Sequence, residues 1–302
     1  MVAARPKAEA LFAPGSRRLA GALSQQHESL VRALHALPAG KAGDIHSSRV
    51  AARRLRSLLR TYRPLLDARR ARLARVDLRS HARALGPVRE ADVRRDLLLE
   101  LARKDPDFPM ADLARLNEAL DEACIGSREL LRRHLLEPTW AALAQALEAL
   151  APIEHLVRQS DAGEEELLRL AARPWRRARR GLEHFPKALE RQHALRLALK
   201  HCRYALEPFA DLAPRRSARL ARRLRAAQDA IGEHRDCLLA GHWVAANARA
   251  LGRSGVQRLT ELVAARELKL LGRASLRAAA VWPDYQKWQR EARRQLQGLR
   301  ND

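Results

Sequence analysis

One basic helical signature occurs twice in this 302-residue chain, and it limits the folds that the chain can adopt. In each copy a histidine is followed by cationic residues three, seven and ten positions later. The matching positions are 147 residues apart: His46/His193, Arg49/Arg196, Arg53/Lys200 and Arg56/Arg203. Further along, Gly86 with Arg89 is echoed by Gly232 with Arg235 at an offset of 146. Two matches at nearly one offset predict a duplicated structural unit.

The spacing places the cationic residues of each copy on one face of a helix, because successive residues turn by about 100°. The opposite face is apolar in both copies, with Ala51, Leu55 and Leu58 in the first and Leu195 and Leu199 in the second. Each helix is therefore predicted to bury one side in a core and to present a narrow cationic stripe on its other side.

Helical patterns extend over the whole chain. Alanine, leucine, arginine and glutamate dominate, β-branched residues are sparse, and apolar residues recur with a 3.6-residue period, so we expect an all-α fold. Glycine and proline breaks predict six helices followed by six more: 16–36, 44–63, 67–85, 88–104, 111–136 and 139–159, then 164–182, 187–209, 215–231, 233–251, 256–279 and 284–299.

The two sets of helices predict a single domain over 1–302, built of an N-terminal helical repeat 1–160 and a C-terminal helical repeat 161–302. Two bundles related by a pseudo-two-fold axis would bring equivalent helices together. The two cationic stripes would then face one shared groove or pore. A bound anion would offset the repulsion between them.

The charge of the chain points to an anionic partner. The chain has 58 basic and 35 acidic residues, a net charge of +23, and such an excess is costly unless a polyanion or counterions offset it. Aromatic residues make up only 4% of the chain, and Tyr204 is the one nearest to the stripes. A charged stripe without aromatic platforms is suited to phosphate oxygens rather than to nucleobases.

Other features set the expected compartment. The three cysteines are far apart and lack metal-ligand spacing, so we expect reduced core thiols, a reducing compartment and no metal or cofactor. No apolar run approaches the ~18 residues that a membrane span needs, and the N-terminus has too little apolar sequence for a signal peptide. The expectation is a cytoplasmic protein without a membrane partner.

The two copies resemble the CHAD domain, the conserved histidine α-helical domain. Its repeats carry the pattern His-x-x-Arg-hydrophobic-x-x-Arg/Lys-x-x-Arg, which is matched from His46 to Arg56 and from His193 to Arg203. A following Leu-Gly-x-x-Arg-acid-x-Asp segment is matched by Leu85, Gly86, Arg89, Glu90 and Asp92, and more loosely in the second copy, with Ile231 and Leu238 at its ends. The resemblance extends from the first helix to about Trp288.

This resemblance implies two pseudo-symmetric helical bundles packed around a central basic channel that binds inorganic polyphosphate. It further implies a non-catalytic protein without a cofactor that targets or organises polyphosphate granules. A protein partner at the granules would be unknown. One alternative is an architectural protein that binds nucleic-acid phosphates. Another is a phosphate-processing enzyme, which normally needs carboxylates that hold a metal, and on the stripes Glu207 alone is acidic.

The residues expected to bind polyphosphate are the eight repeated positions: His46, Arg49, Arg53, Arg56, His193, Arg196, Lys200 and Arg203. Arginine suits phosphate because its planar fork donates two parallel hydrogen bonds. The histidines predict an affinity that strengthens as the pH falls from about 8 to 6. Secondary candidates are Arg54, Arg60, Arg79, Arg83, Arg89, Tyr204, Arg222, Arg225 and Arg235. The acids beside Arg89 and Arg235 are interpreted as helix N-terminal charges and salt-bridge partners.

Overall fold

The computed structural model describes residues 13–39, 41–158 and 161–301, and in these ranges the chain is helical apart from its connections and one isolated bridge between Leu66 and Val157. The N-terminal half contains α1 (Pro14–Ala36), α2 (Ala42–Thr61), α3 (Ala68–Ala84), α4 (Gly86–Lys104), α5 (Met110–Leu136) and α6 (Pro138–Glu148). The all-α prediction is confirmed. The segment 1–12, where no signal peptide was expected, lies outside the described residues.

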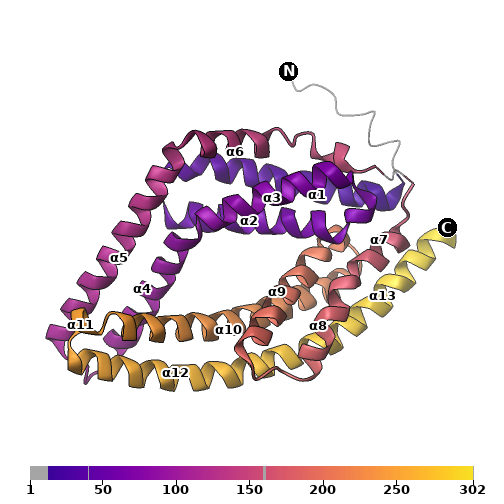
Figure 1. Ribbon diagram of the computed structural model, residues 1–302. Helices are drawn as coiled ribbons and strands as arrows, with labels where there is room; N and C mark the ends of the chain where they lie inside the picture. Colours follow the sequence, from indigo (N-terminus) through magenta and orange to yellow (C-terminus); the bar gives the residue numbers. More distant parts are fainter. Residues whose placement is uncertain (1–12, 40, 159–160, 302) are drawn as a thin grey trace.

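The C-terminal half contains α7 (Glu164–Ala171), α8 (Arg173–Glu183), α9 (Leu189–Ala205), α10 (Pro214–Ala246), α11 (Ala248–Leu251), α12 (Arg253–Ala279) and α13 (Val281–Asn301). Single-turn 3₁₀ helices lie between the longer elements: η2 (Leu37–Ala39), η3 (Arg63–Leu65), η4 (Ile153–Leu156) and η5 (Glu207–Phe209). Figure 1 shows the long helices as a four-sided frame, with α1, α2, α3 and α6 along one side and α10 with α12 along the opposite side. Helices α4 and α5 form the third side, and α7, α8, α9 and α13 form the fourth.

Two apolar cores hold the frame together, and each draws on both halves of the chain. The larger core includes Leu55 and Leu58 of α2 together with Leu199 of α9 and Leu224 of α10. The smaller core joins α4 and α5 to α10, α11 and α12, with Leu98, Leu116, Cys237, Val244 and Leu259 among its members. The apolar faces of α2 and α9 are therefore buried as their spacing predicts, and the basic faces point away from this core. The division into repeats 1–160 and 161–302 stays a prediction.

Helix α10 runs unbroken through Gly232, although the sequence predicted a break there between helices 215–231 and 233–251. The prediction was wrong because the two glycine motifs differ at the next residue. Pro87 follows the first glycine and has no backbone N–H, so α3 ends and α4 begins at that point. Glu233 follows the second glycine and keeps its N–H, so the helix continues.

Two other predicted helices are shorter than expected. The segment 164–182 is divided into α7 and α8, because Pro174 occupies the first turn of α8 and ends the preceding hydrogen-bond ladder. The segment 139–159 ends as a helix at Glu148, four residues before Pro152. The residue before a proline is disfavoured in the α region, so the chain leaves the helix there.

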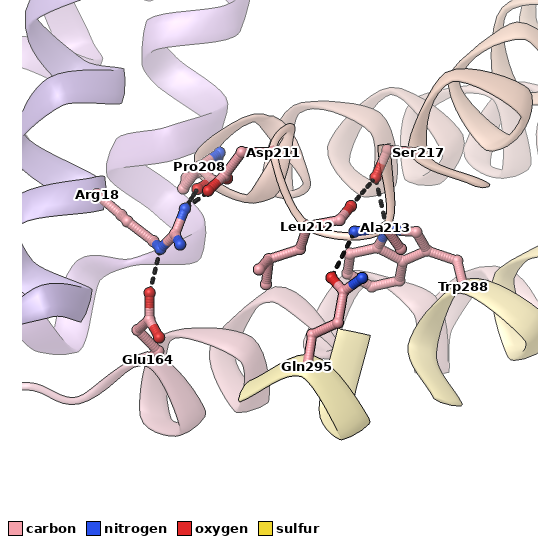
Figure 2. A network of polar contacts seen from close by, with 9 residues as sticks. All are labelled: Arg18, Glu164, Pro208, Asp211, Leu212, Ala213, Ser217, Trp288 and Gln295. Carbon is pink, nitrogen blue, oxygen red and sulfur yellow. Dashed lines mark hydrogen bonds and ion pairs between the residues drawn. The ribbon is translucent and has the colours of Figure 1, made fainter. Parts of the chain in front are cut away.

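A polar network fixes the connection between α9 and α10 against other elements (Figure 2). Arg18 of α1 donates to the carboxylates of Glu164 and Asp211 and, at 3.5 Å, to the carbonyl of Pro208. On the other side of the connection, the amide of Ala213 donates to Oε1 of Gln295 in α13 at 2.8 Å. Charge-assisted bonds of this kind are stronger than neutral ones. The network holds the connection between two helices that line the cavity described next.

Candidate functional site

A cavity of about 600 Å³ lies where α2, α4, α9 and α10 meet. The structure brings five of the eight expected binding residues to its wall: His46, Arg49, Arg53, Arg196 and Lys200. Two secondary candidates, Arg89 and Arg235, also line it. Cations from α2 and α9, which lie far apart in the sequence, therefore share one cavity, as the facing-stripe prediction required.

Arg49 and Arg196 are held in place by equivalent contacts. Nη1 of Arg49 donates to the carbonyl of Ala82 at 2.5 Å, and Nε of Arg196 donates to the carbonyl of Gln228 at 3.3 Å. Ala82 lies in the last turn of α3, where carbonyls lack helical partners, so Arg49 satisfies one of them. One nitrogen of each guanidinium is thus used for positioning, and the remaining N–H groups are available to an anion.

The glycines of the second repeated motif lie beside these two guanidinium groups, and one of them makes room for its arginine. A Cβ atom on Gly232 would lie 2.6 Å from Nη2 of Arg196, which is a steric clash. A Cβ atom on Gly86 would lie 3.5 Å from Nη1 of Arg49, an ordinary contact. Gly232 therefore fulfils a packing requirement in the middle of a helix, where glycine otherwise lowers stability.

Burial and the repulsion between neighbouring cations lower the pKa values of basic groups in the cavity wall. Burial, and then the positive charges of Arg53 and Arg196, lower the pKa of Lys200 from 10.5 to about 6. Burial also lowers the pKa of Arg49 to about 10, with Arg53 as the next cause. The pKa of His46 is lowered by burial and by Arg89, Arg53 and Arg49. An anion in the cavity would reverse these shifts, because it favours the charged form of each group.

Four carboxylates also line the cavity: Glu90, Asp229, Glu233 and Asp236. The sequence analysis interpreted Glu90 and Asp236 as helix N-terminal or salt-bridge charges. It did not place any of the four, which come from α4 and α10, in the cavity. Burial raises the pKa of Asp236, while Arg196 and Arg235 oppose that shift. The helix N-terminal interpretation is wrong for Asp236, because α10 has no end nearby. For Asp92 the salt-bridge interpretation is confirmed, since its Oδ1 lies 2.6 Å from Nη2 of Arg128.

Three of the eight expected residues do not line this cavity. His193 lies in the wall of a neighbouring cavity of about 320 Å³. Arg56 has its pKa lowered by burial and by Arg79, Arg53, Arg75 and Arg60, so it belongs to a row of cations that continues along α2. Arg203 stacks on the ring of Tyr204 with its guanidinium carbon 4.8 Å from the ring centroid, and its Nη2 donates to the Tyr204 hydroxyl at 3.1 Å.

The remaining secondary candidates fall into three groups. Arg60 lines a third cavity, of about 520 Å³, together with other arginines: Arg63, Arg75 and Arg173. Arg54 lies 3.6 Å from Oε1 of Glu207 and above the ring of Tyr204, which indicates a structural contact. The others lie on exposed helix surface outside these three cavities: Arg79, Arg83, Arg222 and Arg225.

Sequence reasoning missed Arg94 and Trp243, which both line the central cavity. The guanidinium carbon of Arg94 lies 5.3 Å from the ring centroid of Trp243 in a cation–π contact. Trp243 lies seven residues after Asp236 and therefore on the same face of α10, but the sequence did not indicate that this face lines the cavity. The α2 and α9 stripes lack aromatic residues as expected, but the wall opposite them contains this one.

Among the residues that the structure describes, no helix is long and apolar enough to cross a membrane, and no group of three or more His, Cys, Asp or Glu side chains is placed to hold a metal ion. The three cysteines, Cys124, Cys202 and Cys237, are free and buried, as expected for core thiols.

Comparison with known proteins agrees with the all-α fold. The structure of PptA from Streptomyces chartreusis superimposes with a TM-score of 0.70 at 20% sequence identity, over 90% of this chain and 99% of that one. The crystal structure of the CHAD domain from the plant Ricinus communis gives a TM-score of 0.64 at 23% identity, over 90% of this chain and 92% of that one. No curated protein matched the chain. The sequence profile of the CHAD domain matches residues 19–245, which is most of the chain. The chain therefore belongs to the CHAD domain family.

Proposed function

We propose that this protein binds inorganic polyphosphate without cleaving it and so attaches to, or organises, polyphosphate granules in the cytoplasm. The proposal rests first on the central cavity, where Arg49 and Arg53 of α2 meet Arg196 and Lys200 of α9. Membership of the CHAD family, which is associated with polyphosphate binding, supports it. Polyphosphate carries roughly one negative charge per unit and offers no bases to recognise, so a cationic cavity is sufficient to bind it.

The mechanism follows from the fixed guanidinium groups. Arg49 and Arg196 each use one nitrogen on a backbone carbonyl, so their forks are oriented before the ligand arrives. Pre-oriented donors lose less conformational entropy on binding than free surface arginines do. Binding displaces counterions from the polymer, and the affinity is therefore expected to fall steeply with salt.

The test is a titration of the protein with long-chain polyphosphate, tripolyphosphate, duplex DNA and RNA at one salt concentration. The site variant replaces four cavity cations by alanine: Arg49, Arg53, Arg196 and Lys200. The matched control removes four exposed arginines: Arg72, Arg83, Arg222 and Arg225. Circular dichroism checks that both variants fold.

We expect tight, length-dependent binding of polyphosphate by the wild type, a loss of at least about a hundredfold in the site variant, and a loss of only a few-fold in the control. Equal binding of all polyanions, with equal losses in both variants, would mean that the surface is generically basic and would overturn the proposal. Tighter binding of DNA or RNA than of polyphosphate at equal phosphate would favour a nucleic-acid partner. Release of phosphate from polyphosphate by the wild type, abolished in the site variant, would overturn the non-catalytic part.

A further inference from the structure

A second cavity adjoins the central one and differs from it in chemistry. It measures about 320 Å³ and shares Arg235, Leu239 and His242 with the central cavity. Its exposed surface is mainly apolar, with Leu189 from α9 and Ile231 and Leu238 from α10 in the wall. A polyphosphate chain consists of phosphate groups alone and has no apolar part to place there. The side cavity is thus suited to a ligand with an apolar body joined to phosphates.

Polar groups line this side cavity on both helices: His234, Arg235 and His242 come from α10, and Glu190, Gln192 and His193 come from α9. Nδ1 of His193 is buried and has no hydrogen-bond partner among the described residues. Unpartnered buried nitrogens are rare, because each loses its hydration without compensation. Glu190 lies one helical turn earlier on α9 and also lines the cavity. The imidazole of His193 can donate to, or accept from, a hydrogen-bonding partner, and the carboxylate of Glu190 can accept. A nucleobase edge offers ring nitrogens that accept and an exocyclic amino group that donates, so it matches this pair.

His193 also connects this cavity to the phosphate site. Its imidazole lies within electrostatic range of Arg235, Arg196 and Lys200, and the last two line the central cavity. A ligand whose base contacts His193 would therefore have its phosphates among the cavity cations. This placement also explains why His193, which begins the same signature as His46, does not line the central cavity itself.

We propose that the two adjoining cavities bind a nucleoside triphosphate, with the base in the side cavity and the phosphates among the cations of the central cavity. The phosphate half of this proposal rests on the proposed function. The bound nucleotide would compete with polyphosphate, because both ligands need Arg196 and Lys200. Protein loaded with the nucleotide would then release polyphosphate when the nucleotide concentration is high.

Calorimetric titration in magnesium-free buffer tests this inference by comparing ATP with tripolyphosphate. Tripolyphosphate carries at least as much negative charge as ATP, so charge alone predicts that it binds at least as tightly. If the base occupies the side cavity, ATP binds about tenfold tighter, since the base buries apolar surface there. Leu238→Trp, which fills the side cavity, should remove that advantage and leave tripolyphosphate and long-chain polyphosphate within about twofold of wild type.

A matched control is Leu197→Trp. Leu197 is a leucine of α9 with 40% exposure and lines neither cavity, so this variant should keep the preference for ATP. An inosine triphosphate arm, in which the exocyclic amino group is absent, should bind more weakly than ATP if Glu190 accepts from that group.

Equal affinity for ATP and tripolyphosphate, or an equal loss of both in Leu238→Trp, would overturn this inference. If long-chain polyphosphate still binds tightly in that case, the proposed function stands without it. If neither polyphosphate nor ATP binds, both fall.

Discussion

The two walls of the central cavity use the same geometry with different chemistry. We call Arg49 and Arg53 the α2 wall, and Arg196 and Lys200 the α9 wall. In both walls the first arginine donates to a carbonyl that lies four residues before a glycine of the facing helix, with distances of 2.5 Å and 3.3 Å. The contacts that position the guanidinium groups are therefore repeated along with the motif.

The walls differ in how they hold their charge. The α2 wall has Arg53 where the α9 wall has Lys200, and burial among other cations lowers the pKa of that lysine to about 6. Arginine stays protonated in such places because its intrinsic pKa is far higher. Near pH 8 the α2 wall is thus fully charged, whereas much of the α9 wall's charge appears only when an anion binds. The lesson is that repeated sequence motifs fix the positions of groups but not their protonation.

The largest expected effect comes from removing one wall at a time. At pH 8, Arg49→Ala/Arg53→Ala should weaken polyphosphate binding about a hundredfold or more, because two charge-assisted contacts of about 1.5–3 kcal/mol each are lost. Arg196→Ala/Lys200→Ala should reduce the affinity by a factor at least about ten times smaller. The neutral Lys200 amine of the free protein must take up a proton before it can contribute to binding, so its removal loses less. Isothermal titration calorimetry at constant salt measures both losses.

Salt dependence gives the control for this experiment. Losing two permanent phosphate contacts should lower the slope of log affinity against log salt by about 1.4, taking the value for single-stranded polyanions. The α2 variant should show that change in full at pH 8. Equal losses of affinity and equal slopes in the two variants would contradict the difference between the walls.

The second expected effect is a pH dependence of the affinity that is caused by protonation of Lys200. The pKa of its amine is about 6 in the free protein and rises when an anion binds, so binding takes up a proton above pH 6. Affinity should therefore increase by about tenfold or more as the pH falls from 8 to 6 and then level off. Lys200→Arg stays charged throughout and should flatten the profile. The charged groups that face this position remain unchanged in that variant: Arg53, Arg196, Arg203 and Asp236.

A parallel pH profile in wild type and Lys200→Arg would assign the proton to another group. His46→Asn separates that possibility, because the pKa of His46 is already lowered by burial and by nearby arginines. If His46 takes up the proton, its variant rather than that of Lys200 loses the pH dependence. Calorimetry in two buffers with different ionisation enthalpies counts the protons directly.

The third effect compares the two glycines. Gly232→Ala places a methyl group 2.6 Å from Nη2 of Arg196 and should displace that guanidinium, weakening polyphosphate binding about tenfold. Gly86→Ala meets Arg49 at 3.5 Å and should change the affinity by less than about twofold. Alanine is more stable than glycine inside a helix, and the flexible end of Arg196 can move away from the new methyl group. The free energy of unfolding of Gly232→Ala, measured by thermal unfolding, should therefore equal that of wild type or exceed it by up to about 1 kcal/mol.

Unchanged affinity in Gly232→Ala, together with normal stability, would show that the orientation of Arg196 does not matter for binding. A double variant, Gly232→Ala/Arg196→Ala, then distinguishes a displaced guanidinium from a general disturbance of α10. If the glycine acts through Arg196, the two changes are not additive.

The sequence was sufficient to predict the helical fold, the repeated basic faces and five of the residues that line the cavity, because each of these depends on spacing within one helix. It did not predict the carboxylates or Trp243, because their place in the cavity depends on how α4 and α10 pack against α2 and α9. The helix face of His193 was predictable, but the cavity that it lines was not, since two cavities adjoin the same helix.

The break predicted at Gly232 shows a different kind of limit. The two glycine motifs were treated as equivalent, yet Pro87 makes the first a helix boundary and Glu233 leaves the second inside a helix. A single side chain thus decides whether the chain forms one long helix or two shorter ones at the glycine. A repeat in sequence is therefore a better guide to which residues line the cavity than to where helices end.

The smallest expected effect concerns the row of cations that continues along α2 beyond the α2 wall. Arg60 is exposed and lines the third cavity with Arg63 and Arg75, whereas the matching position of the other repeat is Glu207, whose pKa is raised by burial to about 7. The row of cations should therefore extend further on the α2 side. Arg60→Glu should weaken long-chain polyphosphate binding by about two- to fourfold, as befits an exposed charge, and leave tripolyphosphate unchanged.

Arg83→Glu makes the same change of charge on exposed surface outside the three cavities. It should change the affinity for either ligand only by the small amount that the change in net charge causes. A series of polyphosphates of increasing length, titrated against both variants, measures where the Arg60 effect begins. An effect that begins only above a threshold length means that the polymer reaches from the central cavity along α2 to the third cavity. An equal effect at every length, shared with Arg83→Glu, would instead mean that Arg60 acts through net charge and that the two walls end at the same point.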